Sequence, residues 1–413
     1  MKIAVVGGGS TYTPELVDGF ARLAPFVSEI VLLDPHQQRL SVVGPFAQRL
    51  LRHHGSDTRL RWTSDVDDAL AGASTVVIQL RVGGQQARIS DETFPLACDC
   101  VGQETTGAGG FAKALRTVPV VLDIARRADP GAWIVNFTNP VGIVTRALLD
   151  DGHRAAGLCN VAIGFQRRWA AALGVDPAAV TLDHVGLNHL TWERAAYVDG
   201  VDRLPELLDK GLDEIAGGLQ LPAEVLASLR CVPSYYLRYF YCHDEVVAEE
   251  RGRPTRGQRV AEIEEQLLQL YADASLTTKP DLLGQRGGAF YSEAAVGLIA
   301  SLHGDDGARH AVNVRNRGFL PFLPDEAVIE ATCRVGSGGA TPLPAPPLIP
   351  ELAGLVAAVS AYEELAVDAA LRGGRDRVYR ALLAHPLVAQ HAKASRLTDE
   401  LLSANRAHLA WLS

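Results

Sequence analysis

Over residues 1–165, short apolar runs alternate with longer amphipathic stretches. The apolar runs predict strands at residues 2–6, 29–33, 75–80, 133–137 and 155–158. The amphipathic stretches predict helices between them, at residues 14–22, 37–53 and 111–127. Strands that alternate with helices favour a parallel, doubly wound sheet. We therefore expect an α/β fold whose first domain, residues 1–165, is of the Rossmann type.

After residue 165 the pattern changes. Residues 181–198 predict paired strands, residues 204–271 are mostly helical, and residues 318–335 return to extended structure. The segment PLPAPPLIP (342–350) has five prolines in nine residues and predicts a stiff connector. Three helical segments then close the chain. We expect residues 166–413 to form a C-terminal α+β domain.

The composition is that of an ordinary globular protein. The chain has 413 residues, of which 47% are apolar and 21% charged, enough for two or three domains and a large core. Its net charge of −9 argues against a nucleic-acid partner, which requires a basic surface. Any bound phosphate must therefore be held by a local arginine cluster.

The chain also lacks the signals of a membrane or secreted protein. No stretch reaches the ~18 uninterrupted apolar residues of a membrane span, and the apolar run in MKIAVVGGGS is too short for a signal peptide. The six cysteines are scattered and show no disulfide framework. We therefore expect a soluble, cytoplasmic protein without a membrane partner.

The first predicted strand leads directly into the glycine-rich turn GGGSTYTPE. Gly7 and Gly9 occupy the first two positions of G-x-G-x-x-G, where backbone approaches the pyrophosphate of a dinucleotide. Ser10 and Thr11 complete the predicted cofactor-binding turn. Tyr12 stands at the third glycine position, so the fingerprint is incomplete.

Two further features support dinucleotide binding. Thr13 is expected to cap a helix that has Pro14 at its first position, so that the helix N-terminus faces the phosphates. The second strand ends at Asp34, whose carboxylate can accept from both ribose hydroxyls and would repel a 2′-phosphate. The sequence therefore predicts NAD rather than NADP as cofactor.

A cysteine and a histidine raise the question of a metal. Cys159 in GLCNVAIGF has no second cysteine within four residues, so it is no CxxC pair. His189 follows in HVGLNHLTW, on a predicted strand. A thiolate and an imidazole can hold a divalent metal with open coordination positions, but buried cysteines often only pack. From spacing alone, His184 or His243 would serve equally well.

Amide and glycine-rich turns add candidate ligand contacts. NFTNP (136–140) follows one predicted strand, and Asn160 ends the next. The carboxyl edge of a doubly wound sheet is where ligands bind, and amides there suit sugar hydroxyls, although asparagine before proline is also common in plain turns. GQETTGAGGF (102–111) is expected to be a loop, either a mobile lid or a linker.

The segments GGGSTYTPE, GQETTGAGGF, NFTNP, GLCN and GLNHL, in this order, resemble the NAD- and metal-dependent family 4 glycoside hydrolases. The resemblance implies a lactate/malate dehydrogenase-like fold, NAD and Mn²⁺ or another divalent metal as cofactors, and a homodimer or homotetramer. It also implies that the C-terminal domain carries catalysis, substrate binding and oligomerisation. The Cys-Asn-Val segment resembles the 6-phospho-β-glucosidase branch, although Ala162 stands where that branch usually has proline.

The resemblance also implies roles for individual residues. Cys159 and His189 match the metal ligands, and Asn160 matches a residue that touches the sugar beside the metal. Tyr236 in PSYYLRYF matches the catalytic base, with Tyr235 and Tyr239 as packing neighbours. Glu104 matches a carboxylate that increases the basicity of the tyrosine. The residues expected to contact the phosphosugar are Arg88, Asn139, Asn160 and Arg256.

The implied activity is hydrolysis of a phosphorylated disaccharide or other 6-phospho-β-glucoside. It proceeds by NAD-dependent oxidation at C3, deprotonation at C2, β-elimination of the aglycone, water addition and re-reduction, and so departs from the two-carboxylate mechanism of most glycosidases. One alternative is a glycosidase of the same family with another glycone. Others are an NAD-dependent 2-hydroxyacid dehydrogenase and a non-catalytic sugar-phosphate sensor, because fold alone does not decide function.

Overall fold

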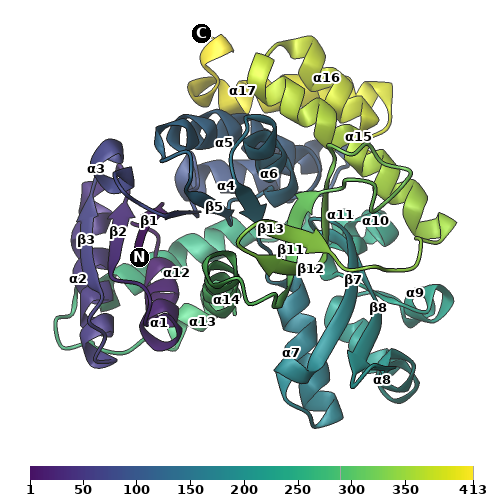
Figure 1. Cartoon of the computed structure of the whole chain (residues 1–413). Helices are drawn as coiled ribbons and strands as arrows, with labels where there is room; N and C mark the ends of the chain where they lie inside the picture. Colours follow the sequence, from purple (N-terminus) through teal and green to yellow (C-terminus); the bar gives the residue numbers. More distant parts are fainter. Residues whose placement is uncertain (289, 413) are drawn as a thin grey trace.

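The computed structural model describes residues 1–288 and 290–412 (Figure 1). The strands of the N-terminal part are β1 (Lys2–Val6), β2 (Glu29–Leu33), β3 (Arg59–Thr63), β4 (Thr75–Ile78), β5 (Trp133–Asn136) and β6 (Ala155–Gly157). They pair in parallel in the order β3-β2-β1-β4-β5-β6. The predicted parallel, doubly wound sheet is therefore confirmed.

The sheet continues without a break into the part of the chain after residue 165. Its further strands are β7 (Val180–Leu187), β8 (Leu190–Val198), β9 (Val201–Asp202), β10 (Val232–Pro233), β11 (Arg309–Arg315), β12 (Val328–Gly336) and β13 (Gly339–Pro342). β11 pairs antiparallel with β6, and the order β6-β11-β12-β7-β8-β10 completes the sheet, with β13 beside β12 and β9 beside β8. One mixed sheet therefore spans both predicted domains.

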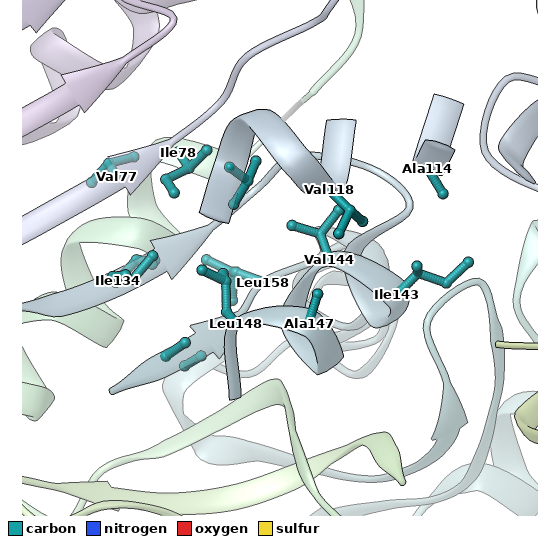
Figure 2. Packing of buried hydrophobic residues seen from close by; sticks show 14 of the residues in the cluster. Val77, Ile78, Ala114, Val118, Ile134, Ile143, Val144, Ala147, Leu148 and Leu158 are labelled. Atoms are coloured by element: carbon teal, nitrogen blue, oxygen red, sulfur yellow. The ribbon is translucent and has the colours of Figure 1, made fainter. Parts of the chain in front are cut away.

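Helices cover the parallel part because its strands are apolar on both faces. All residues of β4 and β5 are buried, as in parallel sheets covered on both sides. The helices of this part are α1 (Thr13–Leu23), α2 (Gln37–His53), α3 (Val66–Leu70), α4 (Gly84–Thr93), α5 (Gly107–Arg127) and α6 (Val141–Asp150). In Figure 2, Ile78 and Ile134 of the sheet lie beside Val118 of α5 and Val144 and Leu148 of α6. Each such buried side chain stabilises the fold by roughly 1.5–3 kcal/mol.

Helices from the second half return to the N-terminal part. The helices between β6 and β11 are α7 (Val161–Leu173), α8 (Leu204–Leu219), α9 (Ala223–Leu229), α10 (Arg238–Tyr241), α11 (His243–Glu250), α12 (Arg256–Ala272), α13 (Leu282–Arg286) and α14 (Tyr291–Gly304). α12 packs on α2 and α4, and α14 packs on α1 (Figure 1). Residues far apart in the sequence therefore meet at the glycine-rich end of the parallel sheet.

The chain closes with three helices, as predicted. The proline-rich segment leads from β13 into α15 (Pro350–Arg372), which is followed by α16 (Arg375–Ala384) and α17 (His391–Asn405). α15 packs on α5 and α6. The yellow-green to yellow helices in Figure 1 are α15, α16 and α17. Within the described residues, no helix is long and apolar enough to cross a membrane.

Several predicted elements need correction. Residues 107–111 are not part of a loop, because α5 already begins at Gly107. Residues 318–327 are not extended, and β12 begins only at Val328. β3 and β11 were not predicted; β3 (RLRWT) is an edge strand in which only Leu60 is buried, so it lacks an apolar run.

Candidate active site

The glycine-rich turn after β1 is tightly packed. Gly7 has φ +85°, and a Cβ on it would lie 2.8 Å from the carbonyl oxygen of Gln79. The Gly9 N–H donates to Oδ2 of Asp34 at 3.0 Å, and a Cβ on Gly9 would lie 2.9 Å from the same oxygen. Both positions therefore require glycine, as in a turn whose backbone must approach a pyrophosphate.

The helix that follows begins differently from the prediction. Tyr12, in helical conformation, occupies the N-cap position of α1, and no side chain caps the helix. Thr13 is already helical, and its Oγ1 accepts a hydrogen bond from Nε2 of Gln79 at 2.8 Å. The predicted capping by Thr13 is wrong, because this hydroxyl is used to tie α1 to the end of β4.

Asp34 lies directly after β2, as expected, and is buried. Its Oδ2 accepts from Gly9, and its Oδ1 accepts from the His36 N–H at 2.9 Å. A carboxylate oxygen has two lone pairs. The side chain is therefore fixed in place by backbone and still able to accept from ribose hydroxyls.

An arginine that the sequence analysis missed lies at the same turn. Nε of Arg286 in α13 donates to Oγ1 of Thr11 at 2.8 Å, and its Nη2 lies 3.3 Å from Oγ of Ser10. Glu264 of α12 pairs with this guanidinium at 3.0 Å. A local cation thus lies beside the predicted cofactor-binding hydroxyls, and no motif around Arg286 could have indicated it.

Cys159, His189 and Tyr236 come from three segments. Cys159 lies between β6 and α7 and is buried. The prediction that His189 lies on a strand is wrong. It lies in the turn between β7 and β8, with φ +63°. The Tyr236 ring, in the 3₁₀ helix η3 (Tyr235–Leu237), stacks on the His189 ring with 3.6 Å between centroids and 8° between planes.

Burial controls the protonation of the two candidate metal ligands. It raises the pKa of the Cys159 thiol, and Glu330 adds to that rise, while the N–H groups of Val161 and Asn160 oppose it. Burial lowers the pKa of His189 to about 4, so the imidazole is neutral near pH 7. A neutral imidazole is the form that binds metals.

The two side chains fit a divalent metal. Nδ1 of His189 is buried without a hydrogen-bond partner among the described residues, and a coordinating cation would deprotonate the Cys159 thiol. Within residues 1–288 and 290–412, no group of three or more His, Cys, Asp or Glu could hold a metal. Two protein ligands would leave positions open for substrate oxygens, as catalytic metal sites require.

Tyr236 is the tyrosine that faces this pair. Burial raises its pKa, and Cys159 and Glu104 raise it further, whereas Arg88 lowers it. The hydroxyl of Tyr235 instead accepts from Nη1 of Arg238 at 3.0 Å. Tyr239 is 2% exposed and packs in an apolar cluster.

Glu104 lies among three cations. Arg81 donates to both of its carboxylate oxygens, at 2.5 and 3.0 Å, Lys113 donates to Oε2, and Nε of Arg88 lies 3.5 Å from Oε1. Burial alone would raise the pKa of Glu104, but these cations hold it well below its usual value. Glu104 is therefore an anion whose field reaches Tyr236.

The predicted phosphosugar residues fall into two places. Arg88 of α4 lies beside the start of α12, because a Cβ on Gly257 would be 3.2 Å from its Cγ. Burial and the charge of Arg88 lower the pKa of Arg256. The Gly257 N–H joins the two helices by donating to Glu92 at 2.6 Å. Asn139 follows β5, and its Oδ1 is buried without a partner in the described part of the chain.

Comparison with known proteins shows the family to which the chain belongs. Residues 2–175 match Family 4 glycosyl hydrolase, and residues 184–388 match the Family 4 glycosyl hydrolase C-terminal domain. The chain belongs to glycosyl hydrolase family 4. The predicted family and the predicted enzyme class, a glycoside hydrolase, are therefore confirmed.

Individual relatives are similar to this family 4 enzyme over nearly its full length. A probable 6-phospho-β-glucosidase of Bacillus subtilis is 36% identical over 99% of this chain and 97% of its own. A phospho-α-glucosidase of Clostridium acetobutylicum is 28% identical over 98% of each chain. The structure of the 6-phospho-β-glucosidase of Thermotoga maritima, with manganese, NAD⁺ and glucose-6-phosphate, has a TM-score of 0.91 and 34% identity over 99% of both chains.

The dehydrogenase-like fold is also confirmed. Malate dehydrogenase of Plasmodium falciparum has a TM-score of 0.55 at 14% identity, covering 90% of this chain and 98% of its own. At that identity the likeness concerns the fold alone.

Behind the candidate metal ligands of this family 4 enzyme lies a buried polar network. Nδ1 of His184 lies 2.6 Å from Glu193, and its Nε2 lies 2.9 Å from Oε1 of Glu330. Oε2 of Glu330 accepts from Asn188 at 2.9 Å and from Asn313 at 2.8 Å. Burial would lower the pKa of His184, but Glu193 and Glu330 raise it to about 10.

This network removes one of the alternative ligands left open by the sequence. His184 has both ring nitrogens engaged by carboxylates. His243, the other alternative, pairs with Asp244 at 2.9 Å. Only His189 combines a neutral, buried ring with an unpartnered nitrogen and contact to Tyr236, within the part of the chain that the structure describes.

Proposed function

We propose that this family 4 enzyme hydrolyses 6-phospho-β-glucosides with NAD and a divalent metal as cofactors. The metal that we expect is Mn²⁺. The observation that carries the proposal is the stacking of Tyr236 on His189, within the electrostatic field of Cys159. It brings a candidate base next to a candidate metal site. The groups are those needed to remove a proton beside a polarised carbonyl.

The cofactors and the protein would divide the chemistry. When bound, NAD⁺ would supply the hydride acceptor for C3 of the sugar, and the metal would supply the Lewis acid that polarises the resulting carbonyl. Tyr236 would take the C2 proton onto its phenolic oxygen, after which the aglycone leaves C1 by elimination. The buried ring needs a nearby cation to act as a base near pH 7, since burial raises its pKa.

Other residues would hold the substrate. The guanidinium groups of Arg88 and Arg256 suit the 6-phosphate, because a planar fork donates two parallel hydrogen bonds. The amides of Asn139 and Asn160 suit sugar hydroxyls. Asp34, held by backbone N–H groups at the end of β2, suits the ribose hydroxyls of NAD and would repel the 2′-phosphate of NADP.

Two observations favour the β-glucoside over another glycone. The B. subtilis 6-phospho-β-glucosidase is more similar to this chain than the C. acetobutylicum phospho-α-glucosidase, at 36% against 28% identity. The segment Cys159-Asn160-Val161 resembles the same branch, with Ala162 as the departure. The homodimer or homotetramer and the roles of the domains stay predictions.

The test is release of p-nitrophenol from p-nitrophenyl 6-phospho-β-glucoside in D₂O, with and without NAD⁺ and Mn²⁺. We expect release only with both cofactors, no net NADH, and deuterium at C2 of the released 6-phosphosugar. A product without deuterium at C2 would contradict proton removal by elimination. Net NADH formation without p-nitrophenol would instead show oxidation of the sugar without loss of the aglycone, and the enzyme would then act as a dehydrogenase.

A further inference from the structure

One buried carboxylate links the segments that carry the two candidate metal ligands. Oε2 of Glu330, in β12, accepts hydrogen bonds from the side-chain amides of Asn188 and Asn313. Asn188 directly precedes His189 in the β7–β8 turn. Asn313, in β11, pairs with Gly157 at the end of β6, two residues before Cys159. A single oxygen atom therefore joins the turn that holds His189 to the strand pair that leads to Cys159.

Both contacts are close and rigid. Glu330 is 1% exposed, and its other oxygen, Oε1, lies 2.9 Å from Nε2 of His184, so the carboxylate cannot rotate without losing a charge-assisted hydrogen bond. A Cβ on Gly157 would lie 2.9 Å from Cβ of Asn313. The strand before Cys159 thus rests directly on the residue that Glu330 holds.

The side chain of Asn188 contacts both Glu330 and Cys159. Besides donating to Glu330 at 2.9 Å, its side chain interacts with the Cys159 thiol. The backbone beside it is unusual, because His189 has a left-handed conformation, with φ +63°, which non-glycine residues rarely adopt. Such a conformation persists only where neighbouring contacts hold it.

We propose that Glu330 is a positioning residue that fixes the distance between Cys159 and His189. It acts through Asn188 and Asn313 and joins Cys159, from the predicted N-terminal domain (residues 1–165), to His189, from the predicted C-terminal domain (residues 166–413). The inference rests on the proposed metal site and adds to it. Residues that orient metal ligands in this indirect way typically change metal affinity by about 10- to 100-fold when removed.

The test is Mn²⁺ affinity, measured by electron paramagnetic resonance on the full chain without substrate. Glu330→Ala is expected to bind Mn²⁺ about 10- to 100-fold more weakly than wild type. Glu330→Gln is expected to stay within about threefold of wild type, because a glutamine oxygen still accepts from both amides and its NH₂ can donate to a neutral His184.

Glu193→Ala is the matched control. Glu193 is the other buried carboxylate on His184, at 2.6 Å, and its removal should lower the unfolding temperature while leaving Mn²⁺ affinity unchanged. Equal weakening of Mn²⁺ binding in Glu193→Ala and Glu330→Ala would overturn the proposal, because the effect would then follow stability alone. Wild-type affinity in Glu330→Ala would also overturn it.

If Glu330→Ala does not fold, the variant Asn188→Ala tests the positioning role instead. It is expected to weaken Mn²⁺ binding by a similar factor at unchanged NAD⁺ affinity, and wild-type Mn²⁺ affinity in it would overturn the proposal. Failure of the metal site itself is distinguishable: wild type would then bind no Mn²⁺, and the proposed function would fail together with the positioning role.

Discussion

Two charge clusters lie close enough to His189 to influence its pKa, and their balance of positive and negative groups is opposite. In the cluster around Glu104, Arg81, Arg88 and Lys113 surround one carboxylate, with a second carboxylate, Glu92, on Arg88 alone. In the cluster around His184, Glu193 and Glu330 surround one imidazole. Groups from both clusters influence the pKa of His189. The same kinds of side chain therefore give one cluster an excess of positive charge and the other an excess of negative charge.

The pKa values of Lys113, in the cluster around Glu104, and of His184 shift in opposite directions. Burial and the neighbouring Arg81 lower the pKa of Lys113 to about 8. The pKa of His184 rises to about 10 despite burial, because two carboxylates face it. Excess positive charge around Glu104 favours an anionic ligand such as a phosphosugar, and excess negative charge around His184 favours a cation near Cys159 and His189.

The largest expected effect falls on Tyr236, the residue stacked on His189. Tyr236→Phe should lower turnover by about 10⁴-fold, the upper end for loss of a general base, while NAD⁺ and Mn²⁺ affinities stay near wild type. The measurement is p-nitrophenol release together with C2 deuterium exchange in D₂O. Tyr235→Phe is the control, and a larger loss in the control would place the base at Tyr235 instead.

The next prediction separates Mn²⁺ binding by Cys159 and His189 from NAD⁺ binding at the glycine turn. Cys159→Ser and His189→Ala should each weaken Mn²⁺ binding by more than the roughly 100-fold expected for residues that only orient the metal ligands. Both variants should also lose metal-dependent turnover. NAD⁺ affinity should change little, since the contacts of the glycine turn with Asp34, Gln79 and Arg39 involve neither variant position. Wild-type turnover of either variant after chelation and Mn²⁺ re-addition would contradict the ligand assignment.

The parts predicted well from the sequence are local. β1, β2 and α2 have the predicted bounds, because each is a continuous apolar or amphipathic run. The glycine turn needs only residues 7–9 and the next strand end, so its pattern is visible in the sequence. Cys159, His189 and Tyr236 were assigned by resemblance to the family, and the structure brings them together.

The parts that escaped prediction depend on contacts across the chain. Arg286 reaches Thr11 from 275 residues away, and Glu330 reaches Asn188 from 142 residues away. Neither lies in a motif. The sheet order that joins β12 to β7 and β11 has no local signature in the sequence. The apolar neighbours of His189 predict a strand, whereas the pairing of Leu187 with Leu190 leaves it in a turn.

A smaller effect is expected for the cationic cluster. Arg88→Met should raise the KM for the 6-phospho-β-glucoside by about 10- to 100-fold, since a hydrogen bond to a charged group contributes about 1.5–3 kcal/mol. Mn²⁺ affinity should not change. Arg309→Met, an exposed arginine that pairs with Thr181, is the control. An unchanged KM in Arg88→Met would remove Arg88 from the phosphate site.

The smallest expected effect is the pH dependence of stability, which should have opposite sign in the two clusters. The folded-state pKa of Lys113, about 8, is below its ordinary value of 10.5. Between these values the unfolded chain holds more protons, so Lys113 makes the unfolding free energy rise with pH. The folded-state pKa of His184, about 10, is above its ordinary 6.5, so its contribution is complete below pH 6.5 and is lost as pH rises toward 10.

Two variants isolate these contributions. Urea unfolding is measured from pH 7 to pH 10 for wild type, Lys113→Met and His184→Gln, with Lys210→Met, an exposed lysine, as control. The stability difference between wild type and Lys113→Met should rise with pH, because the variant lacks the group that loses its proton on folding. The difference between wild type and His184→Gln should fall with pH, and that for the control should stay flat. Slopes of the same sign for Lys113→Met and His184→Gln would show that the two clusters do not differ in charge balance, and the assignment of one to an anion and the other to a cation would lose its electrostatic basis.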